Sequence, residues 1–508
     1  MVKKIGINNF MKWEGLIIGV VSFLILSVTL SDIGLTWDEP FYLLYPLSYG
    51  EWFKTPHFST ITRYFPNEVH PPLGKYIIGS GLLLFSSFIS PLTSLRLPVM
   101  GISSLLIVFL YFITRKFYGK SAGYFSAFAL LFTPRVFGHM HLATLDIPLT
   151  FFFFLSVYTF YMGLSSKKWS MIFGVFTGLT ISVKASGLFL FPPLILWALI
   201  FRRKEAWRNF AFSFVLSPLV FFLLWPRMWV STPLHLKEFL LNQITRLHIP
   251  VYYLGKVYTE SMKVPWHYPL LMTVFTLPFF LLLLSLLGII LSFKKQDEAL
   301  FILPPLFFFF MVSLPQAEKY DGVRLFLPVF PFLMFLAGKG FLFLKEKYLK
   351  SRYFLLYLLL LPSLVSLFLI HPFYLSYYNI LTGGLLGAQR KGMELTYWGD
   401  AINNKVFEWV NTNASEGSTI SFYPAGYRQV KFYSLLGYLR KDLKGQDTIN
   451  EKADYIVLQM REGMFNEKCW ELIKYGKEVF SLGKEGVSLV RIYEGGSIER
   501  ESGGNPHL

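Results

Sequence analysis

The sequence predicts an α-helical membrane protein with about eleven transmembrane helices, followed by a small soluble α/β domain. Three observations predict this fold class: 54% of the 508 residues are hydrophobic and only 16% are charged, long apolar stretches recur, and both features stop near residue 371. An ordinary soluble protein carries about 25% charged residues. The 54 Phe and 12 Trp cannot all be hidden in one water-soluble core of this size. The composition therefore excludes a soluble enzyme, and the single cysteine, Cys469, excludes an internal disulfide.

Eleven apolar stretches can cross a bilayer, for which about 20 residues are needed and about 17 can suffice. They lie near residues 15–31, 97–114, 121–138, 147–164, 169–183, 187–201, 209–225, 269–293, 299–314, 325–344 and 353–370. The first stretch follows three lysines and lacks a small-residue cleavage site. It is therefore predicted to be a retained anchor rather than a removed signal peptide.

Basic residues predict the direction of the spans, because Lys and Arg are retained on the cytoplasmic side. With the N-terminus inside, the cytoplasmic pieces hold 18 Lys and Arg in 44 residues, namely 1–14, 115–120, 165–168, 202–208, 294–298 and 345–352. The outer loops hold 12 in 129 residues, namely 32–96, 139–146, 184–186, 226–268 and 315–324. We therefore expect a multi-pass protein of the plasma or inner membrane with a cytoplasmic N-terminus.

The apolar run Ile77–Ile89 is the one ambiguous segment. Counting it as a twelfth crossing would place the basic runs RKFYGK, FRRKEAWR and KEKYLKSR outside. At 13 residues it is better interpreted as a re-entrant or interfacial helix in the first outer loop.

Residues after 370 change in composition and carry 16 Lys and Arg against 16 Asp and Glu. We predict a membrane domain over 1–370, an interfacial connector over 371–394, an extracytoplasmic α/β domain over 395–495 and a disordered tail over 496–508. In the domain, the sequence predicts a helix in DAINNKVFEWVNTNA, strands in STISFYPAG and ADYIVLQM, a helix in NEKCWELIKYG and a hairpin in EVFSLGKEGVSLVRIYE.

Acidic residues are scarce in the membrane part, with 15 in 370 residues, and Asp38 and Glu39 follow the first span within a few residues. Trp37 precedes them. A carboxylate at the rim of the bilayer is partly desolvated, which raises its pKa toward the range of a general base. The alternative is an ordinary helix start, since Asp and Glu favour the first turn.

A Pro-Pro corner in NEVHPPLGKY stops the chain and begins the next helix. His70 and Lys75 flank this corner. A basic group there can meet a phosphate at the membrane surface. The alternative is a loop-to-helix junction with a snorkelling lysine.

The short loop GHMHLATLDIP carries His139, His141 and Asp146 on the same predicted membrane face as Asp38. Two histidines and an aspartate suggest a metal, but this spacing is not a specific ligand pattern. The preferred interpretation is a carboxylate that orients a substrate sugar.

Two basic residues complete the candidates on this face. Lys184 lies between two short spans, where its charge is costly unless hydrated or paired, so a functional role is the default hypothesis. Arg324 ends an outer loop beside Asp321 and either clamps an anionic head group or pairs with Asp321. Clustered tyrosines in 371–384 fit either an interfacial aromatic belt or sugar recognition.

The order of these parts resembles a known family. The acidic pair, the Pro-Pro corner, RLP…RKFYGK, HLATLDIPL, LTISVKASG and YDGVRLFLPVFPFL are similar to segments of the polyprenyl-phosphate-dependent glycosyltransferases of the GT-C fold, family 39. This group contains protein O-mannosyltransferases and lipid A aminoarabinose transferases. The resemblance implies an enzyme that moves a sugar from a lipid phosphate to an acceptor hydroxyl outside the cytoplasm, with inversion.

Site roles follow from this resemblance by position. Asp38 is implied as the catalytic base, and Glu39 as a residue that shapes its site. The sugar or acceptor is implied to meet Asp146, His141 and Trp37, and the lipid phosphate to meet His70, Lys75, Lys184 and Arg324. Relatives often have Lys at the position of His70, so this departure makes Lys75 the alternative cation there.

No metal and no cofactor are predicted, since the family members that are most similar in pattern require none. The expected partners are a polyprenyl-phosphate-sugar donor, a glycolipid, polysaccharide or protein acceptor, and membrane lipids. A transporter or flippase of a glycolipid is the alternative function, although no internal repeat supports it. Nucleic acid is excluded as a partner, because the net charge of +17 lies entirely in residues 1–370, largely in the cytoplasmic loops.

Overall fold

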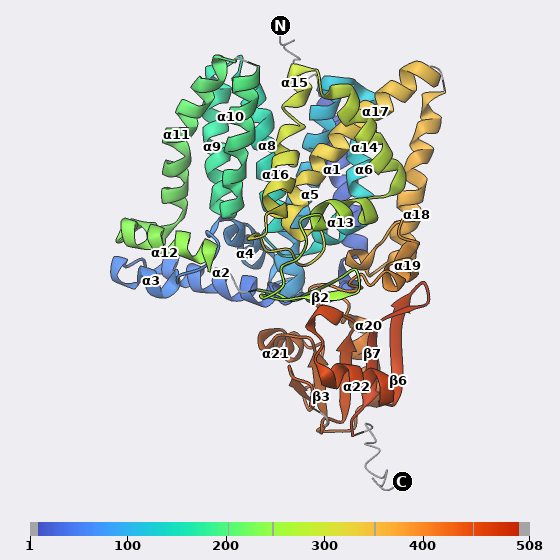
Figure 1. Ribbon diagram of the computed structural model, residues 1–508. Coiled ribbons are helices and arrows are strands. Elements are labelled where there is room, and N and C mark those ends of the chain that lie inside the picture. The colour runs from blue at the N-terminus through green and yellow to red at the C-terminus, as the bar shows by residue number, and fades with distance from the viewer. Residues whose placement is uncertain (1–8, 202, 246–247, 350–351, 451, 497–508) are drawn as a thin grey trace.

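The computed structural model describes residues 9–201, 203–245, 248–349, 352–450 and 452–496. A bundle of helices forms one part, and a smaller α/β domain lies against one end of it (Figure 1). This arrangement confirms the predicted fold class. The predicted tail, 496–508, falls almost wholly outside the described residues.

Apolar sequence builds the bundle. Its main helices are α1 (Asn9–Val28), α5 (Pro91–Tyr118), α6 (Lys120–Leu131), α7 (Pro134–His141), α8 (Asp146–Gly163), α9 (Lys167–Val183), α10 (Phe191–Ile200), α11 (Glu205–Leu224), α13 (Tyr268–Thr276), α14 (Phe279–Ser292), α15 (Gln296–Ala299), α16 (Leu303–Ser313), α17 (Phe330–Tyr348) and α18 (Leu361–Ile370). Among the described residues, six helices are long and apolar enough to cross a membrane, and four more are apolar but shorter. Each of the eleven predicted stretches falls on helical segments.

Prolines divide two of the predicted spans. The stretch 121–138 breaks before Pro134, and the stretch 269–293 breaks before Pro278. A proline has no N–H to donate and is tolerated in the first turn of a helix, so each begins a new helix rather than continuing the old one. Short 3₁₀ segments precede α10, α17 and α18, namely η3 (Ala185–Leu190), η5 (Arg324–Val329) and η6 (Tyr353–Leu360).

Shorter helices gather at the end of the bundle that faces the α/β domain (Figure 1). They are α2 (Glu39–Lys54), α3 (Ile61–Tyr64), α4 (Leu73–Phe85) and α12 (Thr232–Ile244). The predicted interfacial segment is α4, which begins at Leu73 rather than Ile77 because the Pro-Pro corner ends directly before it. Its Leu83 is 87% exposed, as expected for a side chain at a lipid surface.

The α/β domain is built on a five-stranded sheet. Its strands are β3 (Thr419–Tyr423), β4 (Lys444–Gln446), β5 (Tyr455–Gln459), β6 (Glu478–Lys484) and β7 (Val487–Glu494), in the order β4-β3-β5-β7-β6. The strand β3 is parallel to β4 and β5, whereas β7 is antiparallel to its neighbours β5 and β6. Helices α20 (Asn404–Asn413), α21 (Tyr427–Leu435) and α22 (Glu467–Tyr475) complete the domain. The two helices and four strands predicted there are all present; α21 and β4 are additional.

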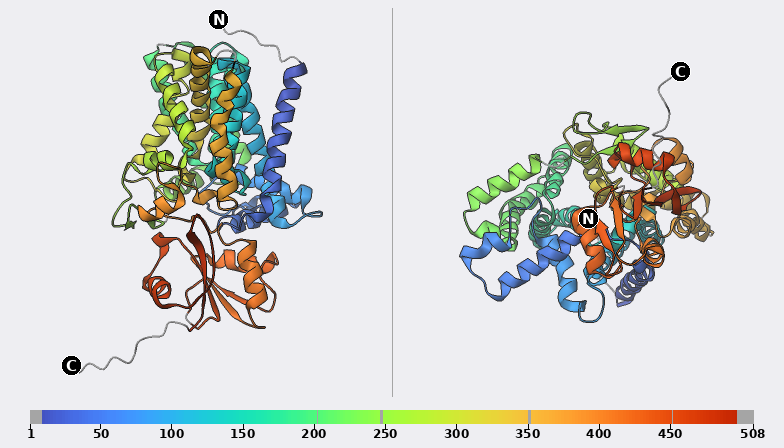
Figure 2. Two further views of the ribbon diagram at one scale, coloured as in Figure 1. Left: turned by 90° about the vertical axis from the view of Figure 1, so that its right-hand side faces the viewer. Right: turned by 90° about the horizontal axis from the view of Figure 1, so that it is seen from below.

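Backbone contacts join the two parts. The loop after α1 pairs with the first residues of the predicted α/β domain through Gly34 N–H to Asp400 O (3.2 Å) and Trp37 N–H to Trp398 O (3.1 Å). A two-stranded ribbon, β1 (Val251–Tyr253) and β2 (Lys256–Tyr258), lies at the same junction (Figure 1). In Figure 2, α1 begins at the opposite end of the bundle from the α/β domain, as the predicted topology requires.

Candidate functional site

One arginine, Arg324, forms ion pairs with three carboxylates where the bundle meets the α/β domain. Arg324 is the first residue of η5, and its Nη2 is in direct contact with Asp38 Oδ2. Its Nη1 lies 2.9 Å from Asp321 Oδ2 and its Nε 3.3 Å from Asp146 Oδ2. These segments are separated by up to 286 residues in the chain, so only the fold unites them.

Lys184 adds a second cation on the far side of Asp146. Asp146 begins α8, and Lys184 follows α9 directly, so both lie at helix ends facing the junction. The Lys184 ammonium is ion-paired with Asp146 Oδ1. The structure thus unites Asp38, Asp146, Lys184, Asp321 and Arg324, which we name the charge cluster. Three carboxylates face two cations there.

Asp38 is the accessible carboxylate of the charge cluster. Its side chain is 24% exposed, compared with 2% for Asp146 and 8% for Arg324. Burial raises the pKa of the Asp38 carboxyl above its usual value, against the lowering effect of Arg324. A carboxylate that is reachable and more basic than usual is suited to accept a proton.

Arg324 packs against the ring of Trp398, and the backbone beside it is strained. The guanidinium carbon lies 3.7 Å from the centre of the Trp398 ring. Trp398 and Asp321 both have positive φ, at 59° and 54°, which non-glycine residues adopt rarely. Gly322 follows at φ 65°, and a Cβ there would lie 2.3 Å from Arg135 Nη1. Such strain is common at functional sites, where the surroundings hold it in place.

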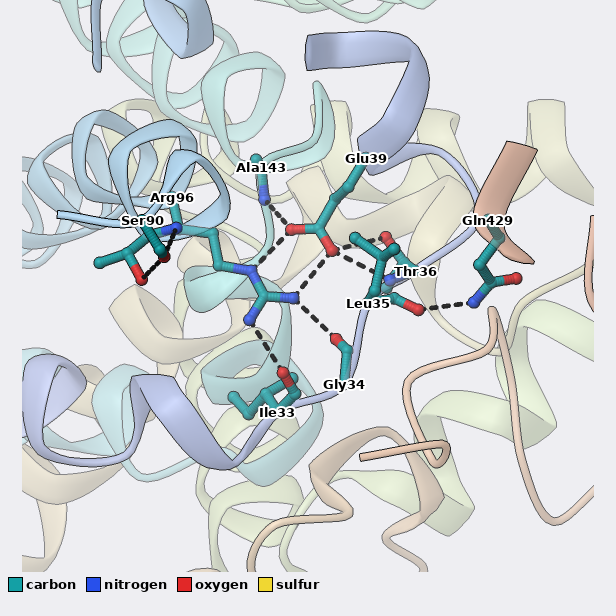
Figure 3. Close-up of polar contacts among 10 residues, drawn as sticks. Ile33, Gly34, Leu35, Thr36, Glu39, Ser90, Arg96, Ala143 and Gln429 are labelled. Carbon is teal, nitrogen blue, oxygen red and sulfur yellow. Dashed lines mark hydrogen bonds and ion pairs between the residues drawn. The ribbon is translucent and has the colours of Figure 1, made fainter. Parts of the chain in front are cut away.

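Glu39 has a different environment from its neighbour. Both oxygens are engaged: Arg96 binds them through Nε (2.7 Å) and Nη2 (2.8 Å), Ala143 N–H donates at 3.0 Å, and Thr36 donates through N–H (2.9 Å) and its hydroxyl (3.1 Å). The remaining donors of Arg96 reach the carbonyls of residues 33 and 34 (Figure 3). Glu39 is 1% exposed, so it anchors the loop that carries Asp38.

Lys75 makes its ion pair and hydrogen bond within the segment that carries the Pro-Pro corner and His70. Lys75 is 2% exposed, forms an ion pair with Glu68 and donates to the His70 carbonyl at 3.0 Å. Its ammonium also lies 4.5 Å from the centre of the Tyr45 ring. The Pro-Pro corner therefore builds a buried structural contact, and Lys75 would have to leave Glu68 to meet a phosphate.

The two histidines in the last turn of α7 have different surroundings. His141 is buried against α1, with Nδ1 2.7 Å from Phe137 O and Nε2 2.9 Å from the Thr29 hydroxyl, so its ring nitrogens are engaged away from Asp146. His139 instead faces Trp398, with ring centroids 5.6 Å apart. Among the described residues, no three His, Cys, Asp or Glu gather as a metal site.

Several residues at the site left no clear signal in the sequence. The sequence marks Asp321 only as a neighbour of Arg324, and it does not single out Trp398. Trp37 was expected beside the sugar or acceptor; in the structure its ring lies 4.3 Å from the guanidinium of Arg461. Arg461, which belongs to the α/β domain, was not anticipated.

Comparison with solved structures gives the fold of the chain. The structure of ArnT from Cupriavidus metallidurans is similar, with a TM-score of 0.55 and 15% identity over 97% of this chain and 99% of that one. Two structures of the Archaeoglobus fulgidus oligosaccharyltransferase have TM-scores of 0.46 and 0.48, with 14% and 13% identity over 89% and 93% of this chain and 70% and 72% of those. The chain has the GT-C glycosyltransferase fold.

Comparison of the sequence with family models matches one segment of the chain. Residues 69–233 match the family model of the dolichyl-phosphate-mannose-protein mannosyltransferases. This segment includes Asp146 and Lys184 but neither Asp38 nor Arg324. No curated protein matches the chain in sequence. The family match and the fold together support membrane sugar transfer.

Proposed function

We propose that the protein transfers a sugar from a polyprenyl-phosphate-linked donor to an acceptor hydroxyl, with inversion, at the membrane face that carries the α/β domain. The observation that carries this proposal is the charge cluster. In it the accessible carboxylate of Asp38 shares Arg324 with the two other acids of the site. A glycolipid, a polysaccharide or a protein is the acceptor.

Asp38 is the general base in this proposal. Its carboxylate takes the proton of the acceptor hydroxyl as that oxygen bonds to the anomeric carbon, and the bond from that carbon to the phosphate oxygen breaks. The polyprenyl phosphate leaves with the electron pair. Attack from the side opposite the leaving group inverts the anomeric carbon.

Arg324 and Lys184 receive the leaving phosphate. Fixed cations stabilise the charge that builds on a leaving group, and a guanidinium binds phosphate through two donors at once. The donor phosphate competes with the carboxylates for Arg324, so its binding releases Asp38 to act as a base. Asp146 keeps Lys184 and Arg324 in place and helps to orient the sugar, while Glu39 positions the Asp38 loop.

An apolar groove supports a lipid-linked donor. It runs between α9, α11 and α12 with a volume of about 960 Å³ and is lined by side chains such as Ile181, Leu188, Phe214, Phe221 and Phe239. Ile181 and Leu188 lie on either side of Lys184 in the sequence. An isoprenoid chain in this groove would bring its phosphate end toward Lys184.

The test is transfer by the reconstituted chain. Vesicles with the wild-type protein and a polyprenyl-phosphate sugar are expected to release free polyprenyl phosphate and form a glycosylated acceptor, whereas Asp38→Asn vesicles release it about 10³-fold more slowly. Mass spectrometry of glycolipids and glycoproteins from cells with and without the protein identifies the acceptor. Movement of labelled lipid between leaflets without release of polyprenyl phosphate would favour the transporter instead.

A further inference from the structure

Arg461 of the α/β domain contacts the charge cluster. It follows β5 and is 0% exposed. Its Nη2 lies 3.0 Å from Asp321 Oδ1, and its guanidinium carbon lies 4.3 Å from the centre of the Trp37 ring. One side chain therefore contacts both the residue before Asp38 and a carboxylate partner of Arg324.

Asp321 is shared between two arginines. Its Oδ2 accepts from Arg324, and its Oδ1 faces Arg461. We propose that Arg461 is a positioning residue for the transfer reaction, so that the α/β domain contributes a side chain to the active site. This inference rests on the proposed function and assigns the domain a part in it.

Charge supports this role. The three carboxylates of the charge cluster exceed its two cations by one, and Arg461, which also faces Glu394 at 3.8 Å, is a third cation beside them. Without it, Asp321 has Arg324 as its remaining guanidinium partner. Arg324 would then be drawn toward Asp321 and away from the position in which it meets Asp38 and the donor phosphate.

Close packing fixes Arg461 in this place. The next residues form η8 (Glu462–Met464), which packs against β1 and the connector. A Cβ on Gly463 would lie 2.6 Å from Glu394 Oε1 and 2.8 Å from Tyr252 N, so only glycine allows this approach. Gly463 N–H donates to Glu394 Oε1 at 3.2 Å, and the same oxygen lies 3.8 Å from Arg461 Nε.

A purely structural role is the competing explanation, because removing one partner of a buried ion pair destabilises a protein in any case. The two roles differ in kinetics. A structural residue lowers the amount of folded enzyme and leaves each folded molecule with normal turnover. A positioning residue changes kcat per folded molecule and the pH at which Asp38 titrates.

The experiment uses the full chain in vesicles, with turnover normalised to folded protein. We expect Arg461→Gln to lower kcat between about 10-fold and 100-fold, as misplacement of reacting groups does. Loss of a nearby positive charge raises the pKa of Asp38, so the acid limb of the kcat profile moves to higher pH. In the double variant with Asp321→Asn, the two effects are expected not to add. Lys477→Gln is the matched control, since Lys477 is 69% exposed in an ion pair of the same domain and its loss should leave kcat unchanged.

Two further variants keep the proposal open to contradiction if Arg461→Gln does not fold. Arg461→Lys keeps the charge but lacks the planar group that stacks on Trp37, so kcat should fall while the acid limb stays in place. Gly463→Ala should lower kcat by displacing η8. Normal kcat per folded molecule in these variants would assign Arg461 a structural role. Active wild-type enzyme with unaffected Arg461 variants would overturn this inference alone, whereas inactive wild-type enzyme would overturn the proposed function.

Discussion

Asp38 and Glu39 are adjacent in the chain, and each carboxylate meets an arginine, yet their surroundings differ. Glu39 has every oxygen paired with donors from Arg96, Thr36 and Ala143, and its side chain is fully covered. Asp38 shares Arg324 with two other carboxylates and remains partly exposed. A carboxylate whose oxygens are all paired with donors does not readily exchange its partners, so Glu39 serves as an anchor. An arginine shared by several acids can exchange one of them for a substrate phosphate, which is what the proposed reaction requires.

The sharpest test of this contrast is Asp38→Asn. The amide has the shape of the carboxylate but accepts no proton, so we expect kcat to fall by about 10³-fold, within the range for loss of a general base. The melting temperature should change little, because Asp38 is partly exposed. Transfer measured with a polyprenyl-phosphate sugar checks the first expectation, and thermal unfolding in detergent checks the second. Wild-type turnover in this variant would remove Asp38 as the base.

Glu39→Gln should show the opposite pattern. Breaking a buried ion pair from one side costs about 3–5 kcal/mol of stability, because Arg96 remains buried without its counter-charge. We expect a large drop in melting temperature and in folded yield, with near-normal turnover in the protein that does fold.

The companion to this variant is Glu39→Gln combined with Arg96→Met. Removing both charges should restore part of the stability. If the double variant were less stable than Glu39→Gln alone, the anchor would not be the ion pair itself.

Arg324→Lys tests the shared arginine. An ammonium is a point charge and cannot reach three carboxylates with fixed geometry. We expect kcat/KM for the donor to fall by about 10²-fold, with much of the loss in donor KM because phosphate binding loses its two-donor contact. Initial rates over a range of donor concentrations measure this split. An unchanged donor KM would show that the phosphate binds elsewhere, with Lys75 the next candidate.

Much of the fold could be predicted from the sequence because its signals are local. Apolar runs mark the helices, and alternating patterns mark β3, β5 and the β6–β7 hairpin. The breaks at Pro134 and Pro278 were missed because an apolar run reads as continuous through a proline. The strand β4 is only three residues long, too short to leave a pattern.

The site was less predictable. Topology placed Asp38, Asp146, Lys184 and Arg324 on one face, and the structure brings these four into direct contact. The same reasoning grouped Lys75 with them, although Glu68, a few residues away, pairs with it instead. Arg461 lies 140 residues after Asp321 in a region of balanced charge, so only packing between the two parts reveals it.

Glu462 of the α/β domain is a third kind of acidic residue, different from both Asp38 and Glu39. Its replacement has the smallest expected effect. Glu462 is buried beside Arg461 without a full counter-charge, and burial raises its pKa to about 8. The folded state therefore holds its proton more tightly than the unfolded state, where the pKa is about 4.5. The unfolded state binds fewer protons in this window, so stability falls as the pH rises from about 4.5 to about 8 and levels off above it.

We expect the melting temperature to decrease between pH 5 and pH 8, and Glu462→Gln to reduce this slope because an amide does not titrate. Asp442→Asn is the control, since Asp442 is a partly exposed acid of the same domain whose pKa is lowered by Arg440 to about 2. A carboxylate of that kind is already ionised throughout the window and leaves the slope unchanged. If both variants kept the wild-type slope, Glu462 would be ionised in the folded protein, and its burial would have to be balanced by a cation in the manner of Glu39.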